Sequence, residues 1–81
     1  MVTYRLEKRN ENELIYLYLL EHDESKGYGR ISVDIKTLEF EVLQYSPCDV
    51  GMSTYARMAI LSIKRKLEAG EVPIEGYNMW Y

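Results

Sequence analysis

Apolar and polar residues alternate along three stretches in the first half of the chain. The first covers residues 2–9, and the same period of two returns in residues 30–35 and 38–45. This period is typical of a strand with one buried face, so each stretch is predicted to be a strand. The residues predicted to point inward are Val2, Tyr4, Leu6, Ile31, Val33, Ile35, Leu38, Phe40 and Val42. At the end of the last stretch the pattern reverses, and Leu43 and Tyr45 fall on the outward face.

A second kind of segment, LIYLYLL, occupies residues 14–20 and is apolar throughout. A helix with this sequence would be apolar on every side, and a small domain cannot bury such a helix. The run is also short and rich in aromatic residues, which favours a strand. We therefore predict a central strand that is covered to some degree on both faces. If Ile15, Leu17 and Leu19 point inward, Tyr16 and Tyr18 fall on the outward face, and the partner surface predicted below takes this orientation.

Short polar segments connect these four predicted strands. Their sequences are NENE, EHDESKGYG and DIKTLE, and each is rich in residues that favour turns. Links of this length favour an antiparallel meander. In the second link, either Gly27 or Gly29 is predicted to adopt a positive φ at the turn into the third strand.

One helix is predicted at about residues 50–69. Asp49, Ser53 or Thr54 is expected to cap its N-terminus, and Gly70 is expected to be the left-handed residue just after its end. Its apolar residues recur with the helical period and form one stripe that should face the sheet. The members of the stripe are Tyr55, Ala56, Ala59, Ile60, Ile63 and Leu67.

The 81 residues are sufficient for one domain of the α+β class. We predict a four-stranded antiparallel meander over about residues 1–46, followed by a C-terminal helix over about 50–69 packed on one face of the sheet. An aromatic C-terminal tail, residues 70–81, completes the chain. A domain of this size has a small core and marginal stability. Cys48 is the only cysteine, so no disulfide within the chain can reinforce the core.

This architecture leaves more apolar surface than one helix and one sheet can hide. Large exposed apolar patches usually mark interaction sites. Three alternatives could cover this exposed surface: the chain's own tail, a second copy of the chain, or another protein. We expect a non-catalytic protein-interaction module that forms a homodimer or binds another protein. The predicted partner surface consists of Tyr16, Tyr18, Leu43, Tyr45, Met58, Leu61, Met79, Trp80 and Tyr81.

The charge of the chain bears on a second class of partner. The formal net charge is −3, and proteins that bind nucleic acid generally present a basic surface. The helix is nevertheless locally basic through Arg57, Lys64 and Arg65. Together with outward tyrosines, these residues would provide phosphate contacts and base stacking. Nucleic-acid binding is therefore the alternative hypothesis, and the overall negative charge argues against it.

Candidate residues for chemistry are few. His22 lies in an acidic loop, and Cys48 precedes the helix without a base or an orienting group nearby in the sequence. A closed zinc site needs four ligands, and these two residues are the only soft ones. We therefore expect no enzymatic activity, no cofactor and no metal. The N-terminal sequence lacks the apolar core of an export signal, and the longest apolar run is too short to span a membrane, so a cytoplasmic protein is expected.

Overall fold

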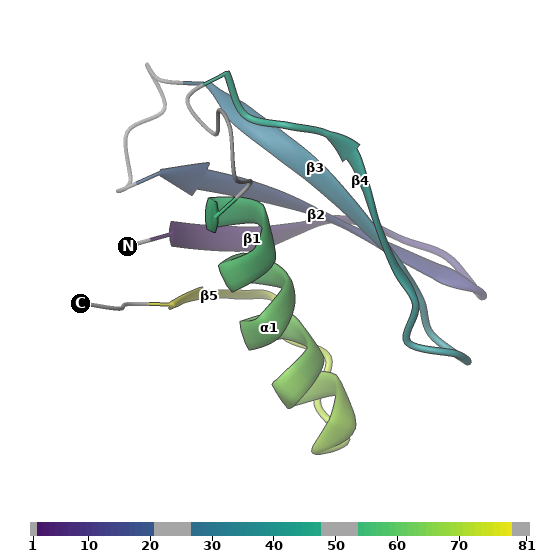
Figure 1. The fold of residues 1–81 in the computed structure, drawn as a ribbon. Helices are drawn as coiled ribbons and strands as arrows, with labels where there is room; N and C mark the ends of the chain where they lie inside the picture. The colour runs from purple at the N-terminus through teal and green to yellow at the C-terminus, as the bar shows by residue number, and fades with distance from the viewer. Residues whose placement is uncertain (1, 21–26, 48–53, 79–81) are drawn as a thin grey trace.

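The computed structural model describes residues 2–20, 27–47 and 54–78 of the chain (Figure 1). These residues form five strands and one helix. In chain order the elements are β1 (Val2–Arg9), β2 (Glu13–Leu20), β3 (Tyr28–Asp34), β4 (Phe40–Gln44), α1 (Thr54–Glu68) and β5 (Glu75–Asn78).

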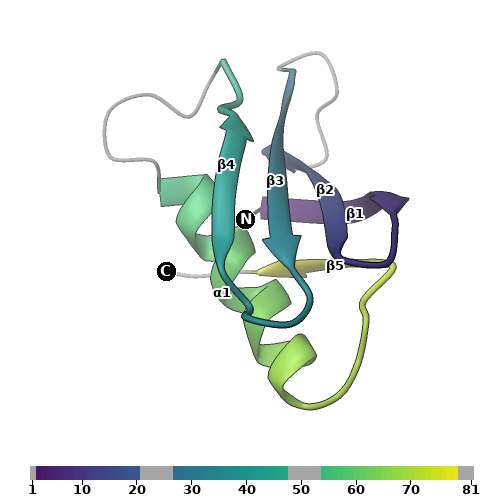
Figure 2. The ribbon, with the colours of Figure 1, turned by 90° about the vertical axis from the view of Figure 1, so that its right-hand side faces the viewer.

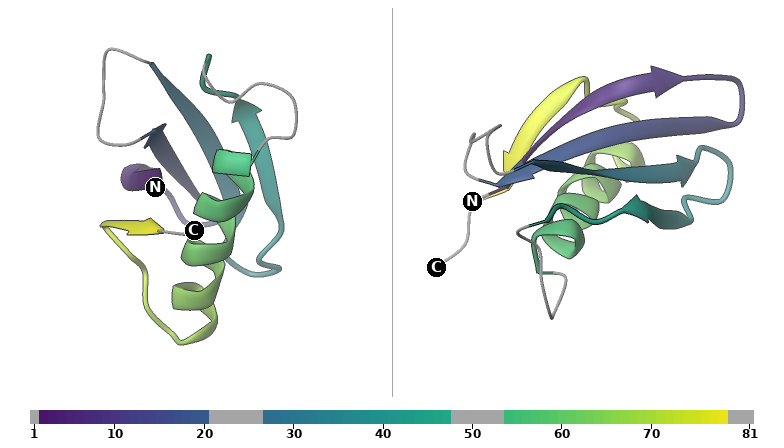
Figure 3. Two further views of the ribbon diagram at one scale, coloured as in Figure 1. Left: turned by 60° about the vertical axis from the view of Figure 1, so that its left-hand side comes forward. Right: turned by 90° about the horizontal axis from the view of Figure 1, so that it is seen from above.

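The strands form a single antiparallel sheet in the order β4-β3-β2-β1-β5. Strands β1 to β4 follow one another as a meander, and α1 lies beneath one face of the sheet (Figures 2 and 3). The predicted α+β class, the meander and the single helix packed on one face are therefore confirmed. We call the face that contacts α1 the inner face and the opposite one the outer face.

The fifth strand is the main departure from the predicted fold. Residues 70–81 were expected to form a tail, but Glu75–Asn78 return to the sheet and pair with the start of β1. The register places Val2 opposite Asn78 and Arg5 opposite Glu75. This part of the tail therefore docks on its own chain. Residues 79–81 lie outside the described residues.

The orientation predicted for the central strand β2 is wrong. Tyr16 and Tyr18 have no exposed surface and lie on the inner face, opposite Leu6 and Tyr4 of β1. Ile15, Leu17 and Leu19 lie on the outer face instead. Leu17 and Leu19 are nevertheless only 6% and 9% exposed, so β2 is buried on both sides as a central strand should be.

The core lies between the inner face and the predicted stripe of α1. The fully buried helix residues are Ala56, Ala59 and Ile63, all members of that stripe. Two of these three residues are alanines, whose small side chains leave room for the large tyrosine rings of the sheet. The inner-face residues of the core are Val2, Tyr4, Leu14, Tyr16, Tyr18, Ile31 and Val33.

The C-terminus of α1 ends as the sequence predicts. Gly70 has a φ of 86°, and its amide donates to the carbonyl of Leu67, while the amide of Glu71 donates to that of Lys66. This pair of hydrogen bonds is the Schellman motif, which satisfies carbonyls of the last turn. At the other end the first helical residue is Thr54, and the candidate caps Asp49 and Ser53 lie outside the described residues.

The hairpin between β3 and β4 corrects one further prediction. Leu38 was expected to be an inward strand residue, but it lies in the turn with a φ of 58°. The turn is organised by the carboxylate of Asp34, which accepts hydrogen bonds from the amides of Lys36 and Thr37. Asp favours such local bonds to the backbone, and they compete with continuation of the strand.

Candidate interaction surfaces

Two inner-face tyrosines stand side by side at the centre of the sheet. Tyr4 of β1 pairs with Tyr18 of β2, and each also pairs on its other side with a glycine of the adjacent strand. A row thus crosses four strands in the order Gly76, Tyr4, Tyr18, Gly29. A Cβ atom at Gly29 would collide with the ring of Tyr18, and one at Gly76 would lie 2.5 Å from the Tyr4 hydroxyl oxygen. The glycines therefore provide the space in which the rings lie.

The hydroxyl groups of the buried tyrosines all find partners at the margin of the core. Tyr16 donates to the carbonyl of Pro73 at 2.8 Å, and the hydroxyl of Tyr18 accepts from the amide of Ser46 at 2.9 Å. The hydroxyl of Tyr4 lies 2.8 Å from that of Ser62 on α1. These bonds connect the sheet to α1, to the segment after β4 that contains Ser46, and to the segment before β5 that contains Pro73. Three of the eight tyrosines therefore have a structural role, although a tyrosine-rich composition also suits an interface.

Burial of the Tyr16 hydroxyl predicts sensitivity to alkaline pH. Burial, together with the neighbouring Tyr4, raises the pKa of Tyr16 from 10.0 to about 12 against a smaller lowering by Arg9. Because this pKa is raised by folding, the associated stability is fully present below pH 10. It is lost progressively as the pH rises from 10 through 12. Urea unfolding at a series of pH values should show this loss, and Tyr16→Phe should show a shallower decline. If the free energy of unfolding falls equally steeply with pH in the unmodified chain and in Tyr16→Phe, the raised pKa of Tyr16 is contradicted.

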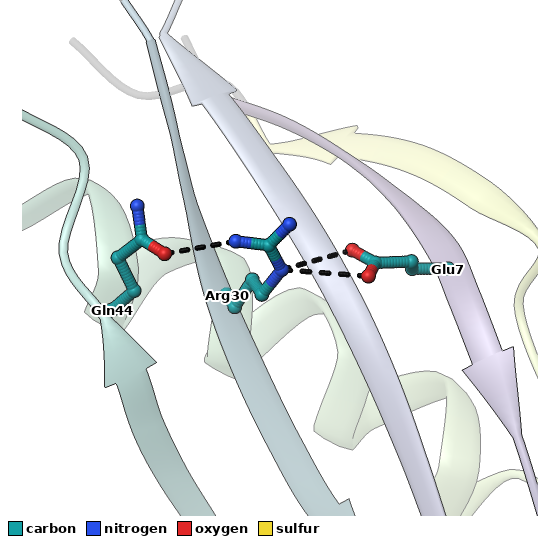
Figure 4. A network of polar contacts seen from close by, with 3 residues as sticks. All are labelled: Glu7, Arg30 and Gln44. Atoms are coloured by element: carbon teal, nitrogen blue, oxygen red, sulfur yellow. Dashed lines mark hydrogen bonds and ion pairs between the residues drawn. The ribbon is translucent and has the colours of Figure 1, made fainter.

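The outer face is partly covered by the chain's own charged side chains. Arg30 of β3 reaches across β2 to the carboxylate of Glu7 at 3.2 Å, and it donates to the amide oxygen of Gln44 on β4 at 2.8 Å (Figure 4). A register shift in β1 leaves Glu7 without a cross-strand partner on β2. Leu17 lies between Arg5 and Arg30 in the register and is only 6% exposed, and long arginine side chains can cover a neighbouring apolar residue with their aliphatic stems.

A second part of the outer face is more apolar. The residues at this end of the strands form a cross-strand row in the order Tyr77, Thr3, Leu19 and Tyr28. We call it the outer apolar row. Tyr77 is 61% exposed and Tyr28 is 38% exposed, and a shallow groove lies between Tyr77 and Leu19. Arg5 and Glu75 also line this groove and give it one charge of each sign.

A separate acidic groove lies at the other end of the outer face, near the β3–β4 hairpin. Its lining includes Glu13, Asp34, Glu39 and Glu41. Among the described residues, no cluster of three or more His, Cys, Asp or Glu side chains has the geometry to hold a metal ion. His22 and Cys48, the other candidates for chemistry, lie outside the described residues.

The residues of the predicted partner surface fall into three groups. Tyr16 and Tyr18 belong to the core, as described above, so they present no surface to a partner. Leu43 and Tyr45 are each 50% exposed, and Leu61 is 38% exposed, whereas Met58 packs partly buried against the core. The remaining three, Met79, Trp80 and Tyr81, lie outside the described residues.

Sequence reasoning missed three exposed apolar residues. Tyr28, Ile74 and Tyr77 are all at least 38% exposed. The sequence predicts Tyr28 in the loop before the third strand, and Ile74 and Tyr77 in the tail. Each belongs to a short segment without alternation, so the sequence carries no signal for its orientation. The pairing of β5 with β1 is what assigns Tyr77 to the outer face.

The basic residues of the nucleic-acid alternative lie on a different side of the molecule from the outer apolar row. Arg57, Lys64 and Arg65 are exposed on α1, beneath the inner face. The outer apolar row, with its exposed tyrosines 28 and 77, lies on the opposite face of the sheet. Phosphate contacts and base stacking by one bound strand need both kinds of group on a common surface. The outer apolar row and the basic helix residues therefore do not form one binding site, whereas Tyr45, an outward tyrosine of the prediction, is 50% exposed and lies outside that row.

Comparison with known proteins adds no family to this description, since no family model, curated protein or solved structure shows a significant match to the chain. Within the described residues, α1 is neither long enough nor apolar enough to cross a membrane.

Proposed function

We propose that the chain is a small protein-interaction module that self-associates and has no catalytic activity. The observation that carries the proposal is the outer apolar row. One helix covers the inner face, while tyrosines 28 and 77 remain 38% and 61% exposed on the other. Tyrosine provides a large contact area with a polar end, and it is enriched among residues that dominate binding energy.

The charges of the groove beside this row support self-association. A short side chain, Thr3, lies between Tyr77 and Leu19 in the register, and Arg5 and Glu75 line the groove with opposite charges. A surface that carries both signs can pair with itself when a two-fold axis brings each charge to its opposite. The small core gives self-association a second benefit, because dimerisation stabilises small domains.

Light scattering coupled to size-exclusion chromatography tests this proposal. At high micromolar concentration the molar mass is expected to approach twice that of one chain, and it should fall toward one chain on dilution. This concentration dependence follows from a small interface. A mass that stays at one chain throughout the high micromolar range contradicts the proposal.

A further inference from the structure

The outer edge of β5 presents backbone groups in a defined pattern. The amide of Leu6 donates to the carbonyl of Ile74 at 2.6 Å, directly before the first pair of the β1–β5 ladder. Hydrogen-bonded and non-hydrogen-bonded pairs alternate along an antiparallel ladder. The amides and carbonyls of Gly76 and Asn78 therefore bond to β1. Those of Glu75 and Tyr77 lie in the plane of the sheet and point outward, that is, away from β1 and toward the free edge.

Exposed apolar side chains accompany this edge. Ile74 is 64% exposed and Tyr77 is 61% exposed, and these are the highest values among the large apolar residues that the structure describes. In the part of the chain that is described, no strand lies beyond β5 (Figure 3). Unpaired groups on an edge strand are a template for a further strand.

We propose that β5 pairs antiparallel with β5 of a second copy, across a two-fold axis at Gly76. This inference rests on the proposed self-association and places the contact at the β5 edge, beside the outer apolar row, of which only Tyr77 takes part. Glu75 of each copy then lies opposite Tyr77 of the other, and the outward groups of these residues form four intermolecular hydrogen bonds. The two five-stranded sheets become one continuous sheet.

The choice of Gly76 as the centre follows from the same alternation. The outward groups belong to Glu75 and Tyr77, so a pair of these two residues forms two hydrogen bonds. A two-fold axis at Gly76 forms this Glu75–Tyr77 pair twice. An axis at Glu75 would instead pair Glu75 with Glu75 of the second copy, which gives one hydrogen-bonded pair and places two carboxylates opposite each other. At the centre, the two copies of Gly76 form a non-hydrogen-bonded pair, in which strands approach most closely. The absence of a side chain suits this position.

Side chains also complement each other in this register. Glu75 and Tyr77 both lie on the outer face, because they pair with Arg5 and Thr3 of β1. The carboxylate of one copy thus lies beside the tyrosine of the other, where the phenol hydroxyl can donate to it.

The opposite edge of the sheet, β4, is unsuited to the same contact. The amide of Asp34 donates to the carbonyl of Glu39, so the backbone groups of Phe40 and Val42 point outward. A two-fold axis between these residues would place the carboxylates of Glu41 directly opposite each other, and like charges at such positions are destabilising. A register shift next to Val42 also interrupts this strand, and such irregularities protect sheet edges.

Proline substitution at the edge tests the inference. Tyr77→Pro removes an outward amide and places a ring in the path of the second strand, while the bonds of β5 to β1 remain. Tyr77→Ala removes the same side chain but keeps the amide. Light scattering over a dilution series should show the proline variant dimerising at least about tenfold more weakly than the alanine variant, because two of four hydrogen bonds are lost.

Circular dichroism and thermal unfolding establish that both variants are folded. If Tyr77→Pro does not fold, Glu75→Pro against Glu75→Ala makes the same test, because the amide of Glu75 also points outward. A dimer that the proline substitution leaves as strong as the alanine one overturns the β5 contact and leaves self-association standing. If the unmodified chain is monomeric in this series, both the β5 contact and the proposed self-association are overturned.

Discussion

Replacement of Tyr16 by alanine is expected to lower the free energy of unfolding by roughly 3–5 kcal/mol. The side chain has no exposed surface, its ring makes an edge contact with Tyr4 at 6.1 Å between centroids, and its hydroxyl donates to Pro73. Alanine would leave a large cavity and an unpaired buried carbonyl. Such a loss approaches the total stability of a small domain. Urea unfolding followed by circular dichroism measures it.

Two variants separate the contributions to this loss. Tyr16→Phe retains the ring and removes the hydroxyl, so it should cost about 1–3 kcal/mol through the unpaired Pro73 carbonyl. Tyr45→Ala is the matched surface control, since Tyr45 is 50% exposed, and it should change stability by about 0.5 kcal/mol or less. A Tyr16→Ala protein as stable as Tyr45→Ala would mean that β2 has its tyrosines outward.

The second large effect is expected at Gly29. Alanine there would place its Cβ against the ring of Tyr18 and 2.5 Å from the carbonyl oxygen of Gln44. A backbone carbonyl cannot move aside without disturbing the β3–β4 ladder, so the expected cost is at the upper end of the roughly 1–3 kcal/mol typical of overpacking. Thermal unfolding should show a lower midpoint.

Gly76→Ala provides the matched comparison. The three atoms nearest to its Cβ all belong to the Tyr4 side chain, and the nearest is the hydroxyl oxygen. The phenol end can shift at the expense of its bond to Ser62, so this variant should lose less stability than Gly29→Ala. If Gly29→Ala is the more stable of the two, the close approach between Gln44 and Gly29 is wrong.

The sequence predicts correctly those strands and helices in which apolar and polar residues alternate with a regular period. Alternation in residues 2–9 determines that Val2 and Tyr4 point inward, and the structure confirms both. The helical stripe predicts the burial of Ala59 and Ile63 in the same way. The reversal at the end of the last predicted strand coincides with the register shift between β3 and β4, beyond which Leu43 is half exposed.

The orientation of β2 could not be predicted from its own residues. When every residue of a strand is apolar, either set of alternate residues can face the helix, because no polar residue shows which face lies toward solvent. The decisive signals lie elsewhere, in the glycines. Gly29 leaves room for one large ring from the neighbouring strand, and only Tyr18 is placed to fill it.

The fifth strand was also beyond sequence reasoning. Four residues, EGYN, carry too few positions to show a period, and glycine disfavours a strand assignment. The strand forms because β1 offers an unpaired edge and because Tyr4 covers Gly76. Its existence depends on pairing with residues of β1 that lie 70 to 76 positions away in the sequence. The proposed partner surface therefore moves from the scattered tyrosines of the sequence prediction to one edge and its adjoining row.

Amide hydrogen exchange in the unmodified chain tests the proposed β5 contact most directly, and three neighbouring amides suffice. The amides of Glu75 and Tyr77 point outward, whereas that of Gly76 bonds to β1 within each copy. We predict that Glu75 and Tyr77 are protected at high micromolar concentration and exchange freely on dilution, while Gly76 stays protected at both. If Glu75 and Tyr77 exchange freely in a sample that light scattering shows to be dimeric, the β5 pairing is contradicted.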